Sequence, residues 1–142
     1  MTTDAGKAAV AALTQKLLAA WAYNDADAFA DLFVEDGTMI LAGVFCSGRD
    51  EIREHVAKEF EGRWKGTQVT GTPISIRSLG PDVTLLLSNG GILEAGETEV
   101  SEDSAIRASW LAVRRDGEWR LAAYQNSPRH DASATGSAAR AA

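Results

Sequence analysis

Residues 114–126 read RRDGEWRLAAYQN, and this stretch decides the fold class of the chain. The dipeptide Asp116-Gly117 favours a two-residue hairpin turn between two strands. The residues before it, SAIRASWLAVR at 104–114, alternate and are rich in apolar side chains, as are the residues after it. We therefore predict an antiparallel hairpin that ends at the amides Gln125 and Asn126, just before Pro128.

A second hairpin lies upstream, where TPISIRS at 72–78 and VTLLLSN at 83–89 flank the turn LGPD. The first half of the chain shows helical periodicity instead. It predicts helices near residues 5–22, 25–33 and 49–65, with short strands at 38–42 and 44–46. The fold class is α+β, with three helices packed on one face of a strongly curved antiparallel sheet.

The composition limits the possible functions. The chain has 142 residues, 45% hydrophobic content and a formal net charge of −6, which argues against nucleic-acid binding. No apolar run is long enough to cross a membrane, and the first residues carry no signal pattern, so we expect a cytoplasmic protein. A single cysteine and two histidines predict no metal site, and we expect no cofactor. We expect one domain over residues 1–127 and a disordered tail over 128–142, which includes His130.

Hairpin geometry sorts the side chains onto two faces. With Asp116-Gly117 as a two-residue turn, Arg115 pairs with Glu118, so Ser109 lies opposite Tyr124 and Leu111 opposite Ala122. The other face then gathers apolar side chains and one amide: Ile106, Trp110, Trp119, Leu121 and Gln125. Both faces are largely apolar, which predicts that one covers the helices and the other meets a partner.

Three segments together resemble one known superfamily. These are NDADAFADLFVEDGTMIL at 24–41, SGRDEIREHVAKEF at 47–60 and the final RRDGEWRLAAYQN. Over about residues 8–127 the chain resembles the SnoaL-like, nuclear-transport-factor-2-like superfamily. It looks most like the small proteins encoded in enediyne and other polyketide antibiotic clusters. The resemblance implies a cone-shaped α+β barrel with a central cavity, in which members either catalyse reactions or only bind.

The resemblance also implies which side chains line the cavity and bind a ligand. The expected lining is largely apolar with a few polar groups. It comprises Leu17, Trp21, Phe33, Leu41, Phe60, Leu87, Asn89, Ser109, Leu111, Tyr124 and Asn126. Leucine occupies the positions where ketosteroid isomerases of this superfamily carry their catalytic groups, namely Leu17, Leu41 and Leu111. Ketosteroid isomerase and limonene epoxide hydrolase chemistry are therefore expected to be absent.

Three other features have an open role. His55 is the candidate catalytic base, because its unperturbed pKa lies near neutrality, although as a flank residue paired with Glu51 or Glu59 it needs no function. Cys46 is interpreted as a small buried hydrophobe rather than a nucleophile. The acidic loop at 94–103 is interpreted as a solvated hairpin tip rather than a calcium site.

The sequence leaves three functions open. The first is a small-molecule cavity protein that binds or helps to process an apolar, enediyne-type polyketide intermediate. The second is a cyclase or isomerase that uses His55 with Tyr124 and Asn126. The third is a non-catalytic partner of a polyketide synthase. In each case the resemblance implies a homodimer through the sheet face that carries Ile106, Trp110, Trp119, Leu121 and Gln125.

Overall fold

The structure, a computed structural model, describes residues 2–129. Within them the chain forms three α-helices, one short 3-10 helix and six strands. The helices are α1 (Thr2–Ala22), α2 (Ala26–Asp31) and α3 (Arg49–Glu61), and η1 (Glu102–Ser104) is the 3-10 turn. The strands are β1 (Phe33–Leu41), β2 (Val44–Ser47), β3 (Gln68–Gly80), β4 (Val83–Leu93), β5 (Ala105–Arg115) and β6 (Glu118–Pro128).

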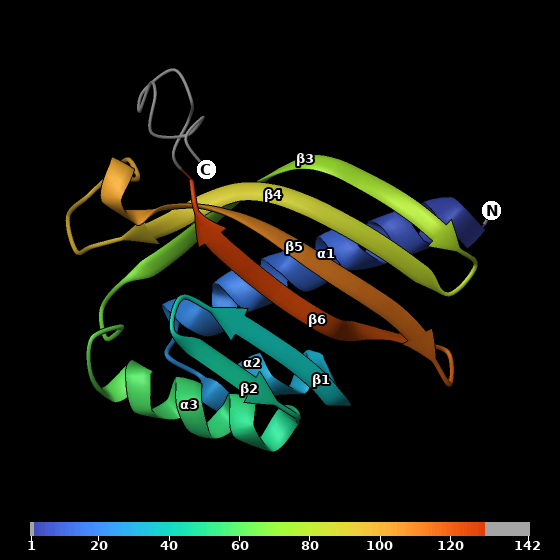
Figure 1. Ribbon diagram of the computed structural model, residues 1–142, viewed down its shortest axis with the longest axis horizontal. Coiled ribbons are helices and arrows are strands. Elements are labelled where there is room, and N and C mark those ends of the chain that lie inside the picture. Colours follow the sequence, from blue (N-terminus) through green and yellow to red (C-terminus); the bar gives the residue numbers. More distant parts are fainter. Residues whose placement is uncertain (1, 130–142) are drawn as a thin grey trace.

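The six strands form one curved sheet in the order β2-β1-β6-β5-β4-β3. Its long strands run across the molecule in front of α1, while α2 and α3 lie beside β1 and β2 (Figure 1). The predicted α+β class, with helices on a curved sheet, is confirmed. One pairing differs from the prediction, because β1 runs parallel to β6 and makes the sheet mixed. Phe33 begins β1 rather than ending the second helix.

Both predicted hairpins are present. The Asp116-Gly117 turn has φ values of 53° and 79°, the pair of positive φ angles that a tight hairpin turn requires. The LGPD segment joins β3 to β4, with Gly80 paired to Val83. Farther along β4, a β-carbon at Gly90 would collide with the carbonyl oxygen of Thr70 on β3. Glycine at this position therefore permits the close approach of the two strands.

The core lies between α1 and the inner face of the sheet. Val10, Leu13 and Leu17 of α1 are buried, as the predicted stripe requires. The helix approaches the sheet closely at Gly6, where a β-carbon would lie 2.8 Å from Thr84 Oγ1 and 3.0 Å from the Trp119 ring. No helix in the described part of the chain is long and apolar enough to cross a membrane. The expected tail, including His130, lies outside the described residues except for Pro128 and Arg129.

Candidate functional site

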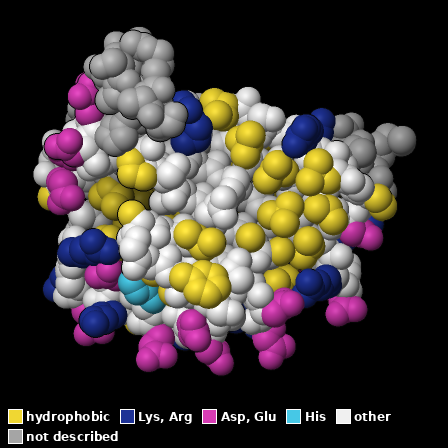
Figure 2. Space-filling view, viewed as in Figure 1, with side chains coloured by type: hydrophobic (Ala, Val, Ile, Leu, Met, Phe, Trp, Pro, Cys, Tyr) yellow, Lys and Arg dark blue, Asp and Glu magenta, His cyan; other side chains and the backbone are white. Residues whose placement is uncertain are grey.

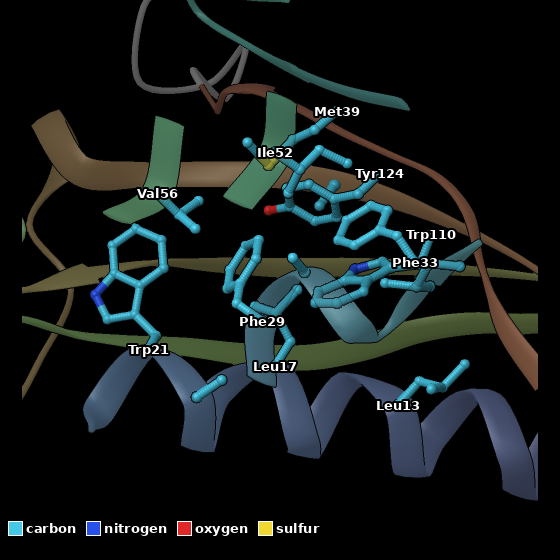
Figure 3. Close-up of a cluster of buried hydrophobic side chains, with 14 of the residues drawn as sticks. Leu13, Leu17, Trp21, Phe29, Phe33, Met39, Ile52, Val56, Trp110 and Tyr124 are labelled. Atoms are coloured by element: carbon cyan, nitrogen blue, oxygen red, sulfur yellow. The ribbon is translucent and has the colours of Figure 1, made fainter. Parts of the chain in front are cut away.

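A cavity of about 200 Å³ lies between α1 and the inner face of the sheet. Most of its lining is apolar and aromatic, contributed by α1, α2, the segment after α3 and five strands. The lining residues are Leu17, Leu18, Trp21, Phe29, Met39, Leu41, Ala42, Arg63, Trp64, Val69, Thr70, Ser88, Gly90, Gly91, Ile92, Ile106, Ala108, Trp110, Tyr124 and Asn126. Figure 3 shows Tyr124 and Trp110 projecting from the sheet toward α1, with Phe29 and Leu17 beyond them.

The hydrogen-bonded polar groups of the cavity wall that lie on the sheet come from β4, β5 and β6. Trp110 Nε1 donates a hydrogen bond to Ser88 Oγ at 2.9 Å, and Asn126 Nδ2 donates to Tyr124 Oη at 2.9 Å. Burial raises the pKa of Tyr124 to about 12, although the bond from Asn126 opposes this shift. The phenol therefore stays protonated at neutral pH and serves as a hydrogen-bond donor rather than a base.

Aromatic side chains line the end of the cavity near the end of α3. The rings of Trp21 and Trp64 stack with centroids 4.1 Å apart, and Trp21 Nε1 donates to Thr67 Oγ1 at 2.9 Å. Arg63 lies beside them with its guanidinium 5.7 Å from the Trp64 ring centroid. Since the Arg63 side chain is 64% exposed, it marks the mouth of the cavity. Figure 2 shows a hollow with an apolar floor at this end of the molecule.

Five of the predicted cavity residues do line this cavity. They are Leu17, Trp21, Leu41, Tyr124 and Asn126. Phe33 and Phe60 are buried but are not among the lining residues. Their rings pack against Phe29, with centroids 6.0 Å and 6.2 Å away, so they support the cavity wall from behind.

The predicted placement of four other residues is wrong. Leu87, Asn89, Ser109 and Leu111 lie on the outer face of the sheet. For Ser109 and Leu111 the reason is a β-bulge at Ala122, where Ala112 pairs with Leu121 but Leu111 pairs with Ala123. Tyr124 consequently pairs with Trp110 instead of Ser109, and every residue of β6 beyond the bulge changes partner. Leu87 and Asn89 share this outer face because they pair with Ser109 and Arg107 of β5.

The same bulge changes the predicted dimer surface. Ile106 and Trp110 line the cavity, and Leu121 is fully buried in the core. Trp119 is partly buried against the core, with the Arg114 guanidinium 5.9 Å from its ring centroid. Among the five predicted interface residues, Gln125 lies exposed on the outer face, where it pairs with Ser109.

His55 is not among the lining residues. Its ring packs edge-on against Trp64 at 5.8 Å, and its Nε2 lies 3.7 Å from Glu59 Oε2. This nitrogen is buried and makes no hydrogen bond within the described residues. His55 therefore packs behind Trp64 and beside Glu59, as the alternative interpretation of this residue expected. It does not line the cavity and is not placed to act on a molecule bound there.

Cys46 is buried on β2, as the structural interpretation predicted. Burial, with a smaller contribution from Glu51, raises the pKa of its thiol, which disfavours the nucleophilic thiolate. Within residues 2–129 no group of three or more histidine, cysteine, aspartate or glutamate side chains is arranged to hold a metal ion. The acidic loop at 94–103 lies within these residues and holds no such group. In this loop Glu97 Oε1 accepts a hydrogen bond from the Glu94 backbone N–H.

Sequence reasoning missed several cavity residues, above all Trp110, Ser88 and Ala108. The small residues Ser88, Gly90, Gly91 and Ala108 are the sequence signal that could have indicated this wall. A sheet face that borders a cavity carries short side chains where the cavity is widest. Trp110 was missed for a different reason. Its face depends on the bulge, and a run of two alanines at 122–123 gives no local sign of where an extra residue is accommodated.

Comparison with models of known protein families identifies the family of this chain. The model of the SnoaL-like domain matches residues 10–130, which is most of the chain. The chain belongs to the SnoaL-like domain family. No curated protein matches the sequence.

Solved structures show the same fold. A cystatin-like domain of unknown function from Nostoc punctiforme superposes with a TM-score of 0.85 at 23% identity, covering 92% of this chain and 82% of that one. An uncharacterised cystatin-like protein from Caulobacter vibrioides gives 0.78 at 26% identity, covering 95% and 98%. The hexachlorocyclohexane dehydrochlorinase LinA-type3 from Novosphingobium barchaimii gives 0.75 at 17% identity, covering 91% and 90%. These matches establish the cystatin-like, NTF2-like cone fold.

Proposed function

We propose that this SnoaL-like domain is a cytoplasmic small-molecule binding protein whose ligand is compact, largely apolar and equipped with a hydrogen-bond acceptor. The observation that carries the proposal is an apolar cavity into which one buried, protonated phenol projects from the sheet. Apolar pockets with a few fixed polar groups are the usual form of small-molecule sites. The apolar wall supplies affinity, and Tyr124 with Asn126 orients the ligand.

The volume of the cavity limits the ligand. About 200 Å³ exceeds the engineered cavities of about 150 Å³ that bind benzene, and it is smaller than the 300–1,000 Å³ or so of drug-sized sites. A polyketide intermediate, the ligand class suggested by the resemblance to antibiotic-cluster proteins, would fit as a short or cyclised fragment. A long enediyne-type polyene would have to extend through the mouth beside Arg63.

Binding is favoured over base catalysis by the chemistry of the lining residues. Removal of a proton from a ligand needs a base within hydrogen-bond reach. Among the described residues, those that line the cavity include no aspartate, glutamate or histidine. The dehydrochlorinase relative shares the fold, but fold alone transfers no activity. A cyclase or isomerase would therefore have to work through hydrogen-bond donors such as Tyr124 and Ser88, without a carboxylate or histidine base.

The test is mass spectrometry of what the protein retains when it is purified gently from its native host. We expect a bound small molecule in the wild type. We expect it to be absent from Ala108→Leu, which fills the cavity from its floor. The matched control is Ala123→Leu, which adds the same side chain to the outer face and should retain the molecule. A wild-type protein that carries no more ligand than Ala108→Leu would contradict the proposal.

We also propose that the protein is a homodimer, through a revised set of residues. The outer face carries directly paired leucines, Leu85 with Leu111, and the partly exposed Ile40 and Ile74. Figure 2 shows a group of apolar side chains over the long strands. A contiguous apolar patch favours association, since burying apolar surface is worth about 25 cal/mol per Å². Gln125 lies within this face and can donate and accept across a two-fold axis.

Sedimentation tests this interface. Leu87→Glu places a charge at the centre of the outer face and should yield a monomer. Trp119→Glu is the matched comparison, because Trp119 contacts α1 on the other side of the sheet. It should lower stability rather than change the mass of the folded protein. A Leu87→Glu protein that sediments as a dimer would place the interface elsewhere.

A further inference from the structure

Two hydroxyl groups of the cavity wall have an unused proton. Tyr124 Oη accepts a hydrogen bond from Asn126, and Ser88 Oγ accepts one from Trp110 Nε1. Neither hydroxyl donates a hydrogen bond to any acceptor within the described residues. Both residues are buried, with 8% and 4% of their surface exposed, so bulk water does not readily satisfy them. Each is thus a donor held in position by the hydrogen bond that it accepts.

The strand register places the two donors in one row across the sheet. Ser88 on β4 pairs with Ala108 on β5, which pairs with Asn126 on β6. The Tyr124 hydroxyl lies at Asn126, because it receives that bond. The two ends of the row are therefore two strand spacings, or about 10 Å, apart at the backbone. The methyl group of Ala108 lies between them and leaves the cavity floor open.

We propose that the cavity recognises a compact ring compound with two hydrogen-bond acceptors at opposite ends, one bound by Tyr124 Oη and the other by Ser88 Oγ. The ring lies over Ala108, and the aromatic side chains of the cavity cover it. This inference rests on the proposed binding function and adds the number and position of the ligand's polar atoms. Ala108 sets specificity, because any larger side chain there would separate the ligand from both donors.

Three bicyclic probes of nearly equal size test the inference by calorimetric titration. Tetralin has no acceptor, 1-tetralone has one carbonyl, and 4-chromanone has a carbonyl and an ether oxygen at opposite positions of one ring. We expect affinity for the wild-type protein to rise in that order. Each hydrogen bond should contribute about three- to tenfold.

Two variants test which hydroxyl group binds which acceptor of the probes. Tyr124→Phe should reduce the advantage of 1-tetralone over tetralin to less than about twofold and leave tetralin binding unchanged. Ser88→Ala should remove the further advantage of 4-chromanone over 1-tetralone. Melting temperatures establish that each variant is folded. The Trp110 indole N–H resonance reports directly on the site, because it loses its partner in Ser88→Ala and shifts when a probe binds to the wild type.

The outcomes separate the two proposals. Three probes that bind the wild type with equal affinity would overturn this inference and leave the binding function intact. Tyr124→Phe and Ser88→Ala proteins that keep the full order of affinities would also overturn it. If no probe binds to the wild type while its host-purified form carries no ligand, the proposed function fails and this inference fails with it.

Discussion

The two faces of the long strands β4, β5 and β6 have opposite chemistry. The inner face carries Ser88, Trp110 and Tyr124, whose rings and polar atoms contact one another: the Trp110 and Tyr124 centroids lie 4.6 Å apart. The outer face carries aliphatic residues such as Leu87 and Leu111, which are only partly buried. The inner face lines the cavity, and the outer face presents partly exposed apolar side chains.

The difference between the faces depends on a single residue in β6. Side chains alternate along a strand, so one extra residue transfers every later side chain to the other face. The bulge at Ala122 lets Leu121 and Tyr124 both point inward, although they are three positions apart. Without it, Tyr124 would leave the cavity. The following predictions test this separation of the faces, beginning with the largest effect.

Deletion of Ala122 should have the largest effect. It forces Tyr124 and Asn126 to the outer face or breaks the pairing of β6 with β1 and β5. We expect a loss of more than about 4 kcal/mol in the free energy of unfolding, or failure to fold. Circular dichroism and urea denaturation measure it. Deletion of Thr98, in the exposed loop before η1, is the control and should cost little. Equal stability of the two deletions would contradict the role of the bulge.

Trp110→Ala and Leu111→Ala compare the faces at neighbouring positions. Trp110 is 3% exposed and donates to Ser88, so its truncation should cost about 3–5 kcal/mol. Leu111 is only half-buried on the outer face, and its truncation should cost about 1 kcal/mol. Chemical denaturation measures both values at a protein concentration where the association state is known. The opposite order would mean that the hairpin has the register without a bulge.

Because Tyr124 is buried on the inner face, the free energy of unfolding should depend on pH in the alkaline range. Its pKa is about 12 in the folded protein and about 10 in the unfolded chain. The unfolded state therefore loses this proton first, and stability falls as the pH rises from 10 toward 12, by up to about 3 kcal/mol. Tyr124→Phe should lack this part of the decrease. The measurement is the free energy of unfolding against pH for both proteins. Identical slopes would show that the phenol is not buried.

Thr84→Val should give the smallest effect, and a favourable one. The Thr84 hydroxyl is buried under α1 without a hydrogen-bond partner within the described residues, whereas valine has nearly the same shape. Removing an unsatisfied polar group should stabilise the protein by about 1 kcal/mol. Thr14→Val is the control, because Thr14 Oγ1 donates to the Ala11 carbonyl at 2.7 Å. A thermal melt that shows no gain for Thr84→Val, or an equal gain for Thr14→Val, would contradict the prediction.

The sequence by itself determined the class of structure and most of its elements. The apolar stripe of α1, the helix that starts after Gly48 and the two hairpins follow from local signals, and the structure contains each of them. Local signals suffice because helical periodicity and the Asp116-Gly117 turn act over a few residues. The resemblance to the family also identified Leu17, Trp21, Leu41, Tyr124 and Asn126 as cavity residues.

Only the tertiary structure decided which face each residue of β5 occupies. The position of the bulge at Ala122 reflects a balance over the whole sheet. Leu121 must pack in the core while Tyr124 reaches Trp110, and β6 must also pair in parallel with β1. None of these partners is local in sequence. The assignments of Trp110, Ser109 and Leu111 therefore failed together, because the side-chain period of two turns a shift of one residue into a change of face.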